Sequence, residues 1–174
     1  MKVIVKQRIQ HLVCATTIIA VGVLLVQIDA QRRPAAQAPA KQGIQVSLKV
    51  GGQTYESNEP GRCTHAPTAA IYQVVSEMWS VQQSSQGRSL ALTFWKPKDG
   101  SAEMVNLSVR NGDASHNLST VRGGAATTGT GKVTFDKSGD GGTFTLEAKT
   151  KAGTVITGRI TCDAFAPHTA EGGH

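Results

Sequence analysis

A two-residue alternation of apolar and polar side chains dominates the chain from Ile44 onward and constrains its fold more than any other feature. In the run Ile44–Val50, isoleucine, valine and leucine alternate with glutamine, serine and lysine, and the pair Gly51-Gly52 then signals a hairpin turn. Such alternation is typical of a β-strand with one buried and one solvated face. Comparable runs lie at 53–56, 90–95, 105–109, 114–121, 133–135, 144–148 and 156–162.

Turn signals separate these runs, most clearly Asn111-Gly112 and the glycine-rich stretch 136–142. Many short strands joined by such turns predict an all-β domain. We expect an antiparallel β-sandwich of about eight strands, with a barrel as the alternative. Its interior is expected to contain the inward set of each strand: Val46, Leu48, Leu92, Phe94, Leu107, Val133, Phe144, Leu146 and Ile160.

The stretch 67–83 is harder to assign, because Ala70, Val74, Met78 and Val81 have helical spacing, with Thr68 placed to cap a helix. Its last residues alternate instead and are rich in β-forming side chains. We expect a loop with a short helical turn, followed by a strand from about residue 78.

The N-terminal thirty residues have the composition of a secretory signal peptide. A basic start precedes an apolar stretch from Leu12 to Ile28, and a small residue, Ala30, follows at the expected cleavage position. The alternative is an uncleaved membrane anchor, since the apolar stretch is near the lower limit for spanning a bilayer. Residues 31–43 are expected to be a flexible leader, 44–165 the β-sandwich domain and 166–174 a flexible tail. The protein is therefore expected to be secreted or periplasmic.

Cleavage at this position would remove Cys14 and leave two cysteines, Cys63 and Cys162. Two cysteines in an exported domain normally form a disulfide, because the compartment is oxidising. Cys162 is in phase with Ile156 and Ile160 on the final strand, so the bond is expected in or beside the core.

Composition argues against several classes of partner and site. The formal charge of the whole chain is +6, but the basic residues are scattered, whereas nucleic-acid binders concentrate theirs in one stripe. We expect no nucleic-acid partner, and a membrane partner only if the signal is uncleaved.

The histidines outside the signal include two in the tail, His168 and His174, so no metal site is expected. We also expect no cofactor, and no catalytic residue is assigned.

Three residues remain as candidate ligand contacts: Trp95, Tyr55 and His116. Strand parity places Trp95 on the face opposite Leu92 and Phe94, where an aromatic ring can stack on a sugar or anchor a partner. The alternative is that Trp95 packs under a loop or at the end of its strand. In either role, the Lys96-Pro97 turn is expected to hold it near a sheet edge. His116 and Tyr55 lie in other predicted strands, and His116 is the only candidate for pairing with a carboxylate.

Several short motifs are also informative together. They are Gly61–Pro67, Ile71-Tyr72, Trp79–Val81, Leu90–Pro97, Ser115-His116, Thr157–Ile160 and Cys162–Phe165. In this set the chain resembles small secreted bacterial proteins that have no assigned function. The resemblance implies bacterial origin and export, and it transfers no activity and no site.

These observations lead to one expected function and two alternatives. We expect an exported, non-enzymatic binding or envelope-associated protein, with an unknown partner in the envelope or outside the cell. The first alternative is a carbohydrate-binding module that uses exposed aromatic residues, Trp95 and Tyr55. The second is a small secreted hydrolase in which His116 acts with a carboxylate.

Overall fold

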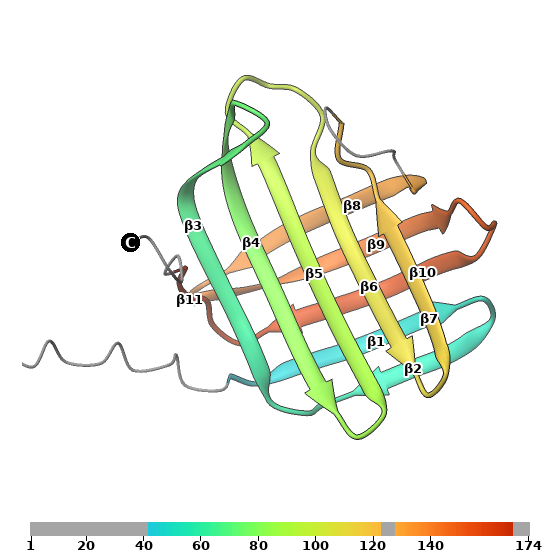
Figure 1. Ribbon diagram of the computed structural model, residues 1–174. Helices are drawn as coiled ribbons and strands as arrows, with labels where there is room; N and C mark the ends of the chain where they lie inside the picture. The colour runs from blue at the N-terminus through green and yellow to red at the C-terminus, as the bar shows by residue number, and fades with distance from the viewer. Residues whose placement is uncertain (1–41, 123–127, 169–174) are drawn as a thin grey trace, which may run out of the picture. The chain divides into compact units, whose positions relative to one another are not determined.

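The computed structural model describes residues 42–122 and 128–168, which form eleven strands in two sheets and no helix (Figure 1). The described residues therefore contain no helix that could cross a membrane. The five-stranded sheet contains β1 (Ile44–Val50), β2 (Gln53–Ser57), β8 (Gly129–Ser138), β9 (Gly141–Thr150) and β10 (Val155–Cys162). The six-stranded sheet contains β3 (Gly61–Ile71), β4 (Val74–Ser85), β5 (Arg88–Pro97), β6 (Met104–Asn111), β7 (Ala114–Ser119) and β11 (Ala166–Pro167).

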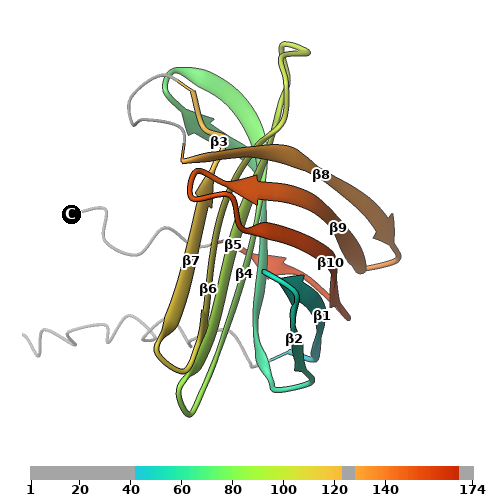
Figure 2. The ribbon, with the colours of Figure 1, turned by 90° about the vertical axis from the view of Figure 1, so that its right-hand side faces the viewer.

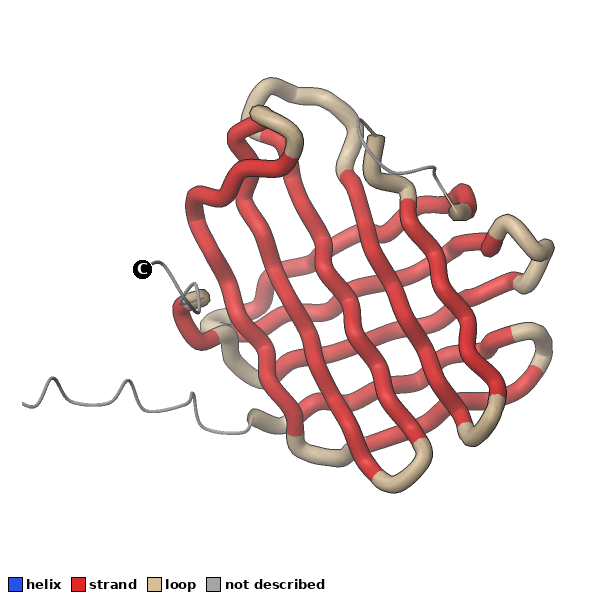
Figure 3. The backbone as a smooth tube through the Cα atoms, in the orientation of Figure 1, coloured by secondary structure: helices blue, strands red, loops and turns tan. Residues whose placement is uncertain are grey.

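The two sheets pack face to face as separate layers, which confirms the predicted β-sandwich over the barrel (Figure 2). The strand order is β2-β1-β10-β9-β8 in one sheet and β11-β3-β4-β5-β6-β7 in the other. All neighbouring strands are antiparallel except β11, which runs parallel to β3. Figure 3 shows that the strands of one sheet cross those of the other steeply, as in orthogonally packed sandwiches.

The core lies between the sheets and contains all nine residues that the alternation predicts to be inward. Phe94 and Phe144 are among the largest fully buried side chains, and they meet edge to face across the two layers. The predicted disulfide is confirmed: Cys63 of β3 bonds to Cys162 of β10, with the two Cα atoms 6.3 Å apart. Because β3 and β10 belong to different sheets, this bond ties the layers together at the core.

The prediction for 67–83 was wrong in its first half. Instead of a loop with a helical turn, β3 and β4 form one long hairpin, and only Tyr72 and Gln73 lie between them. The ladder is irregular between Ala66 and Ala69, where Pro67 supplies no backbone N–H to a partner. The helical spacing therefore arose by chance in a strand pair, and cross-strand pairing decided the outcome.

Strand structure also extends beyond the predicted domain limits at both ends. Gln42, in the predicted leader, forms a β-bridge with Gly61, and its side-chain oxygen accepts a hydrogen bond from the Cys63 N–H at 2.8 Å. In the predicted tail, β11 pairs with β3, and the His168 N–H donates to the carbonyl of His65. The predicted signal peptide, residues 31–41 of the leader and residues 169–174 of the tail lie outside the described residues.

Candidate functional site

Trp95 lies on the outer face of the six-stranded sheet, as its strand parity predicts, and it is half-buried. It sits near the end of β5, a strand in the middle of the sheet, rather than at a sheet edge. Its cross-strand neighbours are Met78 of β4 and Met104 of β6. Met104 is only 7% exposed although it faces outward, so this row of side chains is packed together.

Tyr55 is not an exposed aromatic residue: its side chain is only 2% exposed. It lies in the core, and the Arg88 guanidinium carbon is 4.4 Å from its ring centroid. Burial raises the pKa of the Tyr55 hydroxyl, and the positive charge of Arg88 acts in the opposite, smaller sense. With Trp95 outside the sandwich and Tyr55 inside it, the two residues do not form one aromatic surface.

His116 lies on β7, half-buried and opposite Val109 of β6. Within the described part of the chain, its ring makes no hydrogen bond and no ion pair. The pairing with a carboxylate that a hydrolase mechanism would need is therefore not formed at His116. The structure instead forms such a pair elsewhere, at His65 and Glu77.

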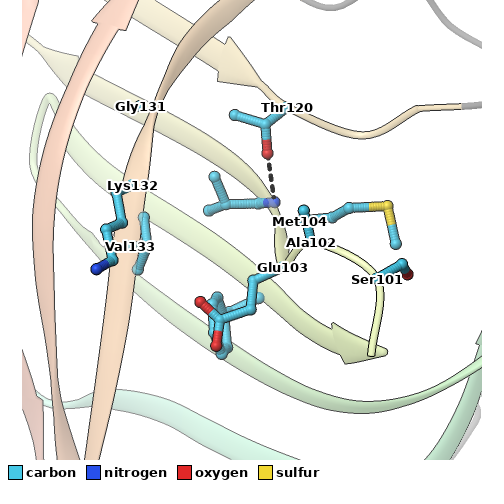
Figure 4. A pocket seen from close by; sticks show the side chains of 10 residues that line it. Ser101, Ala102, Glu103, Met104, Thr120, Gly131, Lys132 and Val133 are labelled. Carbon is cyan, nitrogen blue, oxygen red and sulfur yellow. Dashed lines mark hydrogen bonds between the residues drawn. The ribbon is translucent and has the colours of Figure 1, made fainter. Parts of the chain in front are cut away.

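A pocket of about 440 Å³ lies between β6 and β8, and we call it the β6–β8 pocket (Figure 4). Both sheets contribute to it: Phe94 and Val105 come from the six-stranded sheet, and Val133 comes from the five-stranded sheet. The remaining lining comes from the β5–β6 loop, the first residue of β6, the segment after β7 and the start of β8: Ser101, Ala102, Glu103, Met104, Thr120, Gly131 and Lys132.

Two local features hold the walls of the β6–β8 pocket in place. The Thr120 hydroxyl oxygen accepts a hydrogen bond from the Val105 N–H at 3.0 Å, which fixes the segment after β7 against β6 (Figure 4). On the other wall, Gly131 lies so close to β9 that a Cβ there would be 2.5 Å from the Cα of Ala148. Glycine at this position therefore allows β8 to pair with β9 along its length.

Glu103 and Lys132 are the charged residues among the lining of the β6–β8 pocket. In Figure 4 the Glu103 carboxylate extends from the loop toward β8. Neither side chain makes a hydrogen bond or ion pair with another described residue. The pocket thus combines apolar walls with charged groups that are free to meet the polar end of a ligand.

A second, smaller pocket of about 230 Å³ lies between β3–β4 and the β8–β9 hairpin, and we call it the His65 pocket. His65 Nε2 lies 2.7 Å from a carboxylate oxygen of Glu77, and the His65 ring stacks on Trp79 with centroids 4.8 Å apart. The rest of its lining comes from Phe135, Lys137, Gly139, Asp140 and Phe165.

The His65 pocket could not be predicted from the sequence, because a loop was predicted where the structure has the β3–β4 hairpin. With 67–77 assigned to a loop, His65 and Glu77 have no defined relationship. In the observed hairpin His65 pairs with Trp79, so Glu77, two residues before Trp79, points to the same face as His65. The only signal in the sequence was this matched spacing about the turn.

No group of three or more histidine, cysteine, aspartate or glutamate side chains converges on a metal position in the described residues. Comparisons of the chain with protein-family models, with curated proteins and with solved structures found no match. The candidate functional sites of the described residues are therefore the β6–β8 pocket and the His65 pocket.

Proposed function

We propose that this chain is an exported, non-enzymatic binding protein that holds a small, largely apolar ligand in the β6–β8 pocket. The observation that carries the proposal is the pocket itself: about 440 Å³, walled by Phe94, Val105 and Val133, with Glu103 and Lys132 in its lining. Its volume falls in the range of about 300–1,000 Å³ that is usual for small-molecule sites.

The chemistry of the lining indicates the class of ligand. Aromatic and aliphatic side chains favour an apolar body, because burial of apolar surface there is favourable by roughly 25 cal/mol per Å². The unpaired Glu103 carboxylate favours a ligand with one polar or cationic end, which would orient the molecule in the pocket.

Export is part of the same proposal. The sequence of residues 1–30 has the pattern of a signal peptide, and the Cys63–Cys162 bond is of the kind that persists in secreted and periplasmic proteins. The resemblance to small secreted bacterial proteins supports a bacterial envelope or extracellular location.

The test is a titration with the neutral apolar probe N-phenyl-1-naphthylamine, whose fluorescence rises in apolar surroundings. Ala102 is exposed and lines the pocket, so Ala102→Trp should obstruct the entrance without disturbing the core. We expect at least about tenfold weaker binding, equivalent to about 1.4 kcal/mol. The matched control is Ala152→Trp in the exposed β9–β10 turn, which should bind like the wild type.

A second titration tests the polar end of the ligand. Decylamine should displace the probe less well from Glu103→Gln than from the wild type, whereas decanol should displace it equally well from both. Glu56→Gln, an exposed change on β2, is the matched control. The proposal fails if the wild type does not bind the probe, or if Ala102→Trp binds it as the wild type does.

A further inference from the structure

We infer that the His65 pocket is a second binding site, and that it takes a neutral, hydroxyl-rich ligand of about the size of one pyranose sugar. This site is separate from the β6–β8 pocket, with which it shares no lining residue. It also differs in character, because hydrogen-bonding side chains surround its aromatic wall.

The aromatic wall consists of Phe135 and Phe165, whose rings meet edge to face with centroids 5.7 Å apart. Both residues are half-buried, so part of each ring faces the pocket. Trp79 is almost fully buried; its ring stacks on His65 and contacts Phe135. Ring surfaces of this kind accept the apolar C–H face of a sugar ring.

The polar groups of the His65 pocket come from two directions. His65 and Glu77 project from the six-stranded sheet, while Lys137 and Asp140 come from the hairpin of the five-stranded sheet. The two carboxylates accept hydrogen bonds, and the lysine ammonium donates them. A hydroxyl group both donates and accepts, so a ligand with several hydroxyls can satisfy both kinds of group at once.

The charges of the lining disfavour the other ligand classes. An anion would meet the carboxylates of Glu77 and Asp140, and a small organic cation would accept no hydrogen bond from the ammonium of Lys137. A wholly apolar ligand would displace water from these charged groups and give them no hydrogen bond in return. A neutral hydroxylated molecule avoids all three costs.

Part of the site is held in position before any ligand binds. The hydrogen bond between His65 and Glu77 fixes both side chains, and the stacking on Trp79 fixes the plane of the His65 ring. Groups that are already ordered lose little conformational freedom on binding. By contrast, the side chains of Asp140 and Lys137 make no hydrogen bond or ion pair with other described residues and are free to meet the ligand.

Saturation-transfer difference NMR tests the inference with the methyl pyranosides of glucose, galactose, mannose and N-acetylglucosamine. We expect transfer to the ring protons of at least one of them. Asp140→Ala should weaken that binding at least about fivefold, and it should fold normally because only the backbone carbonyl of Asp140 accepts a bond, from the Phe165 N–H. The matched control is Asp136→Ala, an exposed position on the same hairpin that lies outside the pocket lining.

Ala102→Trp separates this site from the β6–β8 pocket, since it should leave pyranoside binding unchanged. The inference is overturned if none of the four pyranosides binds, or if their binding is lost in Ala102→Trp and kept in Asp140→Ala. It is also overturned if tetramethylammonium or acetate, tested in the same way, binds in an Asp140-dependent manner and the pyranosides do not. None of these results depends on whether N-phenyl-1-naphthylamine binds.

Discussion

The guanidinium carbon of Arg88 lies 4.4 Å from the ring centroid of Tyr55, and this contact joins the two sheets at the start of β5. Tyr55 belongs to β2, the edge strand of the five-stranded sheet, and Arg88 opens β5 of the other sheet. A cation over an aromatic face stabilises by about 0.5–2 kcal/mol, depending on how far the pair is removed from water. The contact therefore helps to hold β2 against the opposing layer.

The same contact predicts how stability depends on alkaline pH. Burial raises the pKa of Tyr55 above its ordinary value of 10.0, and the charge of Arg88 offsets only part of that rise. In this range the unfolded chain loses the tyrosine proton more readily than the folded chain. The contribution of protonated Tyr55 to the stability of the fold is therefore fully present below about pH 10, and it is lost as the pH rises through the folded-state pKa of Tyr55.

Thermal melts between about pH 8 and about pH 11 measure this effect. The wild type should lose more stability over this range than Tyr55→Phe, which has no hydroxyl to titrate at this position. Every other ionisable group is the same in both proteins, so the difference between the two pH profiles isolates Tyr55. Parallel profiles for the two proteins would contradict the prediction.

The Cys63–Cys162 bond should contribute a large part of the stability of the domain. The two cysteines are 99 residues apart in sequence, and cross-linking a loop of that size is worth about 4–5 kcal/mol in the chain-entropy model. We expect the double variant Cys63→Ala/Cys162→Ala to lower the free energy of unfolding by up to about that amount. Urea unfolding measures it, and a loss below about 1 kcal/mol would show that the bond contributes little.

Trp95 should be a packing residue on the outer face of the sandwich. Trp95→Ala removes an indole ring that lies between its cross-strand neighbours Met78 and Met104. The Trp95 side chain is only half-buried, however. We expect a loss of about 2 kcal/mol, less than the 3–5 kcal/mol typical of a fully buried ring. Gln82→Ala, at an exposed position on the same sheet, should change stability by less than about 0.5 kcal/mol. A Trp95→Ala loss as small as that of the control would instead favour an open stacking surface.

The alternation of side chains was sufficient to predict the sandwich, because a strand with one buried face repeats every two residues. Ile156, Ile160 and Cys162 could be placed inside from this period alone, and the disulfide followed from the number of cysteines. The two sheets could not be assigned in the same way. The assignment of strands to sheets depends on pairing between segments that are distant in sequence, such as β1 and β10. The alternation within a single strand does not indicate its partner.

The pockets could not be predicted from the sequence for the same reason. The β6–β8 pocket joins Phe94 to Val133 across the two layers, and each looks like an ordinary core residue in its own strand. Tyr55 shows the opposite error, since an aromatic residue in a polar strand appeared exposed but is covered by Arg88 from the other sheet. In both cases the deciding neighbour belongs to the opposite layer.

The turn between β3 and β4 predicts a stabilising change. Tyr72 and Gln73 have φ values of 47° and 69°, the left-handed conformation that a tight two-residue hairpin turn requires and that side chains other than glycine and asparagine disfavour. The steric cost is about 1–2 kcal/mol per residue, and Tyr72 recovers little of it by burial because it is 51% exposed. Tyr72→Asn/Gln73→Gly supplies the pair that such turns prefer, so the free energy of unfolding should rise by about 1–2 kcal/mol. Tyr72→Ala/Gln73→Ala keeps both Cβ atoms and should give no gain. Urea unfolding of the three proteins decides the matter: if the Asn-Gly variant is no more stable than the alanine variant, the turn is not strained.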